Sequence, residues 1–279
     1  MLSRNSVKGW LLCAPALLVL AASFGAPLLT LARMSLNRSE DGQIQPDLTL
    51  ATYAKLAADP YTASLTLGSF GLAAQAATAA LLLCFPMALL LHRSRSRFRS
   101  VLAVAAVAPL LVSGTARVVG WIAILGDNGL VNAVLAATGL PRQALINNLT
   151  GVRIGLTESV MPYTVLALLA GFGRLDPLLE QAASTLGARP LAAFWRITVP
   201  LTLPAAAGAW LLAFVLGVSA FITPKLMGGG RVFVLATEIY DAATTTLDWP
   251  GAAALSLYVL ALLAAVLAAQ AALTRRVRA

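Results

Sequence analysis

The sequence predicts an all-α membrane protein with six transmembrane helices, and three observations lead to that prediction. Hydrophobic residues make up 59% of the 279 residues, and charged residues make up only 11%. Soluble domains of this length usually carry about 25% charged residues. Long apolar runs recur along the chain, and basic residues cluster at the ends of these runs. The composition therefore places the chain in the membrane class.

The apolar runs fit the thickness of a bilayer. A hydrocarbon core of about 30 Å needs roughly 20 helical residues at about 1.5 Å each. Six runs are long enough, at about 10–31, 62–91, 101–125, 154–173, 200–224 and 251–273. Uninterrupted runs of this kind span membranes only as helices. The first run is longer than the core of a secretory signal, which has about 7–15 residues. We therefore expect a retained anchor and a single transmembrane domain over residues 1–279.

The distribution of charges predicts the orientation of the chain. If the N-terminus is cytoplasmic, the inside segments contain the basic residues Arg4, Lys8, Arg93, Arg95, Arg97, Arg99, Arg174, Arg189, Arg196, Arg275, Arg276 and Arg278. The outside segments then contain the acidic residues Glu40, Asp41, Asp47, Asp59, Asp127, Glu238, Asp241 and Asp248. This bias places both termini in the cytoplasm. It also accounts for the net charge of +9 without nucleic acid, so the expected partner of the apolar runs is the lipid bilayer.

Several classes of site are not expected from the residue types present. The two cysteines, Cys13 and Cys84, lie inside apolar runs, and His92 is the single histidine. A disulfide framework, a zinc site and a histidine-based catalytic triad are therefore not expected. None of the three lysines follows a glycine, so the phosphate-binding loop of an ATPase is missing. We expect no enzyme activity, metal or cofactor in this chain.

A short segment at residues 176–200, between the fourth and fifth runs, differs from the rest. Asp176 and Pro177 are a typical helix start, and Gly187 is a typical helix end. Apolar residues on one predicted face are Leu178, Leu179, Ala182, Ala183 and Leu186. Such a helix either lies on the lipid interface or docks in a groove of another subunit. A second short helix is expected from Pro190, and Pro200 opens the fifth span.

The residues of this segment resemble a known motif. Gln181-Ala182-Ala183, Gly187, and then Ile197 and Pro200 resemble the coupling motif of ATP-binding-cassette (ABC) importer permeases, which reads Glu-Ala-Ala, a glycine, and Ile-x-Leu-Pro. Two departures occur, since Gln181 replaces the glutamate and Val199 the leucine. The resemblance implies that ATPase coupling uses Glu180, Gln181, Ala182, Ala183, Gly187, Ile197 and Pro200.

Other stretches resemble the spermidine/putrescine-type branch of the same permeases. They are GDNGLVN, IGLTESVMPYTVLAL, AFITPKLMGGG and LDWPGAAAL, within about residues 126–255. The resemblance implies a type I ABC importer permease of the bacterial inner membrane, with a cytoplasmic coupling helix between spans 4 and 5. It implies ABC ATPase subunits, a periplasmic solute-binding protein and a second permease, which is either a different chain, as this branch favours, or an identical copy.

The solute that this resemblance implies is a polyamine or a similar cationic compound. Related branches carry iron, opines, phosphonates, thiamine or sulfate, and these remain alternatives. An ion-coupled secondary transporter is a less favoured alternative. It would show internal symmetry and a chain of acidic residues within its spans, and the sequence shows neither.

Three residues are candidates for the translocation pathway. Glu158 lies within the fourth run, where a charge costs about 2.5–3.5 kcal/mol, so it should face protein or water. It either attracts a cationic solute or pairs with Arg117 or Arg153. Tyr163 is a second candidate, with packing as the alternative. Asn128 near the outer mouth is the third, with loop capping as the alternative.

Overall fold

The computed structural model of the chain describes residues 4–40, 43–93, 98–173 and 175–278. Arg95, Arg97, Arg174 and Asp41, which entered the prediction of orientation, lie outside these ranges. The residues form two compact units. Unit 1 comprises residues 1–63 and 238–265, and unit 2 comprises residues 64–237 and 266–279.

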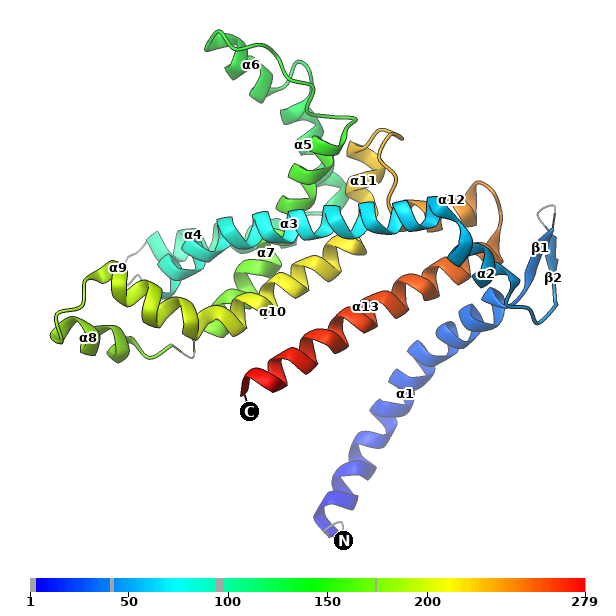
Figure 1. Ribbon diagram of the computed structural model, residues 1–279, viewed down its shortest axis with the longest axis horizontal. Helices are drawn as coiled ribbons and strands as arrows, with labels where there is room; N and C mark the ends of the chain where they lie inside the picture. The colour runs from blue at the N-terminus through cyan, green and yellow to red at the C-terminus, as the bar shows by residue number, and fades with distance from the viewer. Residues whose placement is uncertain (1–3, 41–42, 94–97, 174, 279) are drawn as a thin grey trace. The chain divides into compact units, whose positions relative to one another are not determined.

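Helices dominate the described chain, which confirms the predicted fold class (Figure 1). In chain order the elements are α1 (Arg4–Ser35), β1 (Arg38–Glu40), β2 (Gln43–Gln45), α2 (Ala51–Ala58), α3 (Pro60–Arg93), α4 (Phe98–Val107), the 3-10 turn η1 (Ala108–Leu111), α5 (Gly114–Leu125), α6 (Leu130–Ala137), α7 (Leu149–Phe172), α8 (Pro177–Thr185), α9 (Pro190–Ala193), the π turn η2 (Phe194–Thr198), α10 (Val199–Val218), α11 (Ile222–Met227), α12 (Leu235–Thr244) and α13 (Trp249–Arg278).

The predicted number of membrane spans is confirmed. Within the described ranges, six helical stretches are long and apolar enough to cross a membrane: Leu12–Ser35, Pro60–Arg93, Gly114–Ala137, Leu149–Phe172, Pro190–Val218 and Trp249–Ala272.

The third span differs from the run predicted at residues 101–125. That run is interrupted after η1, where Val112 adopts an extended conformation with ψ of 136°. Pro109 lies in η1 and donates no backbone hydrogen bond, which favours a break in a helix. The apolar stretch Arg99–Leu111 is therefore a separate, shorter helix, and α5 begins only at Gly114. Apolarity alone did not reveal this break, because both pieces are apolar.

Unit 2 has an apolar core between α3, α7 and α10. Its buried residues include Cys84 of α3, Leu168 and Phe172 of α7, and Ala209 of α10. A Cβ added at Gly171 of α7 would overlap the side chain of Ala205 in α10. This crossing therefore needs a glycine, as is common where membrane helices pack closely.

Figure 1 shows α8 and α9 as a lobe of unit 2 beyond the start of α10, away from α5, α6 and α11. A segment that connects two spans thus folds outside the packed helices of its own unit. Its position makes it available to another molecule.

Unit 1 contains α1, the β1–β2 hairpin and α2. The hairpin pairs Arg38 with Gln45 in antiparallel register. Asp59 follows α2 and caps the first turn of α3, where its carboxylate accepts hydrogen bonds from the Thr62 hydroxyl at 2.8 Å and the Thr62 amide at 3.0 Å. These bonds favour the ionised form, so the pKa of Asp59 lies below its ordinary range, with the Thr62 hydroxyl as the largest cause.

Candidate functional site

Helix α8 has the ends that the sequence predicts. Asp176 is the N-cap, and its Oδ1 accepts a hydrogen bond from the Leu178 amide at 2.9 Å. At the other end Gly187 has φ of +83°, a conformation that favours glycine. The Ala188 amide donates to the Ala183 carbonyl at 3.0 Å, which completes a glycine-based helix stop. Local side chains therefore fix both ends of this short helix.

The second short helix is irregular. Pro190 starts α9, but after four residues the chain continues as the π turn Phe194–Thr198 and then as α10. Pro200 thus lies inside a continuous helical stretch and does not open it, in contrast to the prediction. Because Pro200 has no N–H, the Arg196 carbonyl lacks its α-helical donor. A π turn at this position changes the bonding pattern where an α-helix could not be complete.

The apolar face of α8 points outward. Leu178 is 63% exposed and Leu186 is 88% exposed. Gln181 and Ala182 are also exposed, whereas Ala183 is half-buried. An ordinary amphipathic helix buries its apolar face against its own protein. In α8 this apolar face is exposed instead, so the helix presents apolar side chains to whatever covers this lobe.

Glu180 lies on the opposite side of α8 and faces the protein. Its Oε1 accepts hydrogen bonds from Arg93 Nη2 and from the Thr198 hydroxyl. Arg93 Nη2 also donates to the Thr198 hydroxyl at 3.3 Å. Arg93 is the last residue of α3, and Thr198, which is fully buried, is the last residue of η2. The acid of the motif segment is therefore bound within its own chain.

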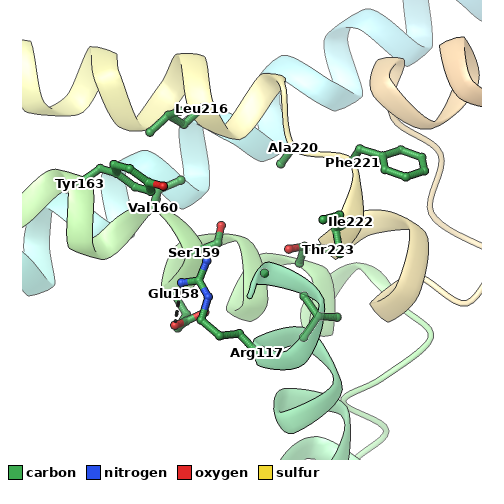
Figure 2. A pocket seen from close by; sticks show the side chains of 12 residues that line it. Arg117, Glu158, Ser159, Val160, Tyr163, Leu216, Ala220, Phe221, Ile222 and Thr223 are labelled. Atoms are coloured by element: carbon green, nitrogen blue, oxygen red, sulfur yellow. Dashed lines mark hydrogen bonds and ion pairs between the residues drawn. The ribbon is translucent and has the colours of Figure 1, made fainter. Parts of the chain in front are cut away.

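A second group of polar residues lines a pocket of about 200 Å³ between α5, α7, α10 and α11 (Figure 2). Arg117 of α5 and Glu158 of α7 form an ion pair in it, with 3.4 Å between Nη1 and Oε1. Their side chains are only 17% and 21% exposed. Of the two basic partners considered for Glu158, the structure selects Arg117. Arg153 lies elsewhere and lines a different pocket with Gln75.

The ion pair leaves much of the guanidinium unused. The Arg117–Glu158 distance is longer than the 2.7–2.9 Å or so of a strong charge-assisted hydrogen bond. Arg117 Nε is buried, and no hydrogen-bond acceptor among the described residues reaches it. Arginine has five N–H donors, so a polar group that enters this pocket would find donors available.

The other two pathway candidates are in different surroundings. Tyr163 lines the same pocket as Glu158, one and a half helical turns further along α7 (Figure 2). Asn128 is not among the residues that line it. Asn128 is exposed, and its side-chain oxygen accepts a hydrogen bond from Arg142 at 3.4 Å. The neighbouring Asn132 is buried and donates to the carbonyls of Gly126 and Gln143, so hydrogen bonds of the Asn132 side chain hold this loop.

Two residues of these sites were not found from the sequence. Arg93 is one of many arginines at the end of an apolar run, and Thr198 occupies the unspecified position of the Ile-x-Leu-Pro part of the motif. Neither carries a signal that separates it from similar residues.

Metal binding has no support in the described residues, since none of them form a group of three potential metal ligands.

Comparison with known proteins places this geometry in a family. Residues 100–279 match the model of the family described as binding-protein-dependent transport system inner membrane component. The spermidine/putrescine transport system permease protein PotB of Escherichia coli is 28% identical over 258 residues, which cover 90% of this chain and 89% of PotB. PotB of Haemophilus influenzae is 27% identical over 252 residues, which cover 90% of this chain and 84% of that protein.

A further relative is the molybdenum transport system permease protein ModB of Mycobacterium bovis. It is 34% identical over 210 residues, which cover 73% of this chain and 77% of ModB. Among solved structures, a bacterial ABC transporter involved in import of the acidic polysaccharide alginate has a chain similar to this one. The TM-score is 0.77 with 18% sequence identity, and the match covers 98% of both chains.

Proposed function

Because the chain belongs to the family of binding-protein-dependent transport system inner membrane components, we propose that its α8 lobe is the docking site for an ABC ATPase. The chain is a multi-pass inner-membrane permease of an ABC importer, a transport component and not an enzyme. Its family implies ATPase and solute-binding-protein partners. In our proposal residues 1–279 form one permease domain, and Gln181, Ala182, Ala183 and Gly187 belong to the coupling surface.

One observation carries this assignment of α8. Leu178 and Leu186 are exposed on a helix whose two ends are firmly capped. Exposed apolar residues on a rigid, protruding helix are the pattern that a groove on a partner recognises. An interfacial lipid-binding helix is the alternative, and it predicts no effect of these residues on ATPase retention.

The test is retention of the ATPase by variants with one acidic substitution. Leu186→Asp places a charge in the proposed interface and should reduce co-purification of the ATPase at least tenfold, about 1.4 kcal/mol. Leu48→Asp is the matched control, since Leu48 is also a highly exposed leucine, at 75%, but lies before α2. Equal retention in both variants would assign the α8 face to lipid.

For the solute we propose a polyamine or a similar small cation, with Glu158 and Tyr163 on the pathway and Asn128 near its outer mouth. Two PotB relatives that cover 90% of this chain support the class of solute. Glu158 is the acidic residue of the pocket, and it is bound to Arg117 by one long contact. A solute ammonium group can compete for such a carboxylate.

A second candidate solute is an oxyanion such as molybdate. The ModB relative is more identical to this chain than the PotB relatives are, although over a shorter length. Arg117 also has an Nε that no acceptor among the described residues reaches, and guanidinium groups match oxyanions well. Uptake of labelled spermidine and of molybdate by cells with the complete transporter separates the two candidates. Spermidine uptake that exceeds background supports the cation, and molybdate uptake alone supports the oxyanion.

We also propose that both termini face the cytoplasm and that the second permease is a different chain. The orientation follows from the basic residues of the presumed inside segments. A different chain as the second permease is what the resemblance to the polyamine-type branch favours. Co-purification from the native host with mass spectrometry identifies it.

A further inference from the structure

We propose that Glu180 is a positioning residue that fixes α8 to the ends of two membrane helices and does not contact the ATPase. With Arg93 and Thr198 it forms a group that we call the Glu180 clasp. This inference rests on the proposed coupling role of α8 and assigns the acid of that segment a role within the permease itself.

The clasp joins three segments that are distant in the sequence. Glu180 Oε1 accepts from Arg93, 87 residues away, and from Thr198, 18 residues away. The third side of the triangle is the 3.3 Å contact between Arg93 Nη2 and the Thr198 hydroxyl. One carboxylate oxygen thus receives two donors, and the Thr198 hydroxyl both donates and accepts. A movement of α8 that kept the helix intact would have to break these bonds or pull α3 and η2 with it.

The helices that the clasp joins are anchored in the core of unit 2. Arg93 ends α3, whose residues Ala88 and Leu91 are buried against Phe172 of α7. The ring of His92 also lies edge-on to Phe172, at 6.2 Å between centroids. Through Arg93, the clasp therefore joins α8 to the packed contact between the end of α3 and Phe172 of α7.

Thr198 makes the corresponding connection to α10. Its side chain is fully buried, and its carbonyl accepts a hydrogen bond from the Thr202 hydroxyl at 2.8 Å. Because η2 runs directly into α10, a force on Thr198 is passed along a continuous helix. The clasp thus connects α8 to α3 and α10, two of the helices that contribute buried residues to the apolar core of unit 2.

Each charge of the clasp lies at the helix end that favours it. Glu180 is in the first turn of α8, and Arg93 is in the last turn of α3. The helix dipole stabilises an acidic side chain near a helix N-terminus and a basic side chain near a helix C-terminus. Each charge is therefore stabilised at its own helix end independently of the ion pair. This lowers the entropy cost of bringing the two side chains together.

The different exposure of Gln181 and Glu180 distinguishes a positioning role of Glu180 from direct contact with the ATPase. Gln181 is exposed on α8, next to the exposed Ala182, whereas the Glu180 side chain is only 32% exposed and has two donors. The exposed surface of α8 thus carries leucines and uncharged polar side chains, those of Gln181, Ser184 and Thr185. An acid that bound the ATPase would have to leave both of its present partners.

The experiment uses the complete transporter in lipid nanodiscs, with hydrogen–deuterium exchange of α8 and ATPase retention as the two measurements. The variants are Glu180→Gln, Arg93→Gln and Thr198→Val. Asp176→Asn is the matched control, because it removes the same charge from the same helix while asparagine remains a good N-cap. The charge swap Arg93→Glu/Glu180→Arg tests rescue.

Loss of the clasp should speed amide exchange in α8 about fivefold, the size expected for a partly exposed ion pair worth about 1 kcal/mol. Glu180→Gln and Arg93→Gln should show this change and still retain the ATPase, and Thr198→Val should show a smaller one. The control should match the unmodified transporter. The swap should restore most of the protection, which a general loss of structure would not allow.

Three outcomes would overturn the inference. Unchanged exchange in Glu180→Gln means that the clasp does not hold α8. Unchanged exchange with reduced ATPase retention assigns Glu180 to the ATPase interface and leaves the proposed function intact. A swap as poorly protected as the single variants rules out a specific pair. If the unmodified chain retains no ATPase, the proposed function fails, while exchange in α8 still decides whether the clasp exists.

Discussion

At the scale of single residues, the Arg117–Glu158 pair is the feature whose role matters most for transport. Both side chains are largely buried and belong to membrane-spanning helices. Glu158→Gln keeps an oxygen acceptor for Arg117, so the helices should still assemble. The carboxylate charge is lost, so the KM for spermidine uptake should rise about tenfold, corresponding to about 1.4 kcal/mol.

Arg117→Gln and the double variant complete a cycle that separates the two roles of Glu158. If Glu158 serves only its partner, the double variant should transport better than either single variant, because no uncompensated charge remains. If Glu158 contacts the solute, the double variant should transport as poorly as Glu158→Gln. Arg153→Gln, in α7, is the control for the loss of an arginine from a membrane-spanning helix outside this pocket. Equal kinetics in all variants would show that neither the Arg117–Glu158 pair nor the charge of Glu158 contributes to transport.

Gly187 permits a second test at this scale. An added Cβ would meet no atom within 4 Å, but φ of +83° disfavours any larger residue. Gly187→Ala should therefore destabilise the end of α8 by about 1 kcal/mol and reduce uptake modestly. Gly187→Trp should insert in the membrane normally and abolish uptake, because a large ring beside α8 blocks docking.

Gly139 provides the matched control for this test. It also has a positive φ, +74°, and open space around it, but it follows α6. Gly139→Trp should leave ATPase-coupled uptake close to normal. The role of Gly187 in coupling would be disproved by normal uptake in Gly187→Trp, measured in membranes with equal amounts of the permease.

At the scale of elements, the start of α3 depends on a cap whose charge can be measured. The Thr62 hydroxyl is the largest cause of the lowered pKa of Asp59. A lowered pKa in the folded state means that the cap is fully stabilising above the unfolded-state pKa, about 3.9, and is lost as the pH falls through the lower folded-state value. The start of α3 should therefore be insensitive to pH near neutrality.

Thr62→Val removes that donor and should raise the pKa of Asp59 towards its ordinary value. Titration of 13C-labelled aspartate carboxylates by NMR measures the shift, and Asp59→Asn identifies the resonance. Thr52→Val, in the neighbouring α2, is the control. An unchanged pKa in Thr62→Val would show that the backbone amides alone determine the ionisation of Asp59.

Elements with strong signals at their ends were predictable, and irregularities inside long apolar stretches were not. The ends of α8 follow from Asp176 and Gly187, whose effects reach only a few residues. The break before α5 was missed because the run was judged by its apolarity, although Pro109 and the Ser113-Gly114 pair lie beside the break. The π turn was also missed, since its cause is the missing donor of Pro200 acting on an earlier turn.

The two ion pairs show the same limit of sequence-based prediction for contacts between helices. Glu158 had two possible basic partners, and the one chosen is 41 residues away in the sequence, on another helix. Glu180 and Arg93 are 87 residues apart. Pairing at such distances depends on how helices pack, which periodicity and composition do not encode. The sequence could indicate that Glu158 needs a partner but not which arginine supplies it.

At the scale of the whole molecule, the number of membrane spans relates the side of the membrane on which α8 lies to the side of the two termini. The helix lies between the fourth and fifth of six spans, so it must be on the same side of the membrane as both termini. Its proposed ATPase partner binds only from the cytoplasm. The distribution of basic residues predicts the same side independently. A single measurement of orientation therefore tests both arguments.

Cysteine labelling with a membrane-impermeant maleimide makes that measurement. In a background with Cys13→Ala and Cys84→Ala, single cysteines replace the exposed residues Asp47, before α2, and Ser184, in α8. Asp47→Cys should react in spheroplasts, because an odd number of crossings separates it from the N-terminus. Ser184→Cys should react only after the membrane is permeabilised. Labelling of Ser184→Cys in intact spheroplasts would place α8 outside, where no nucleotide-driven partner could reach it, and the coupling role of this helix would have to be abandoned together with the predicted orientation.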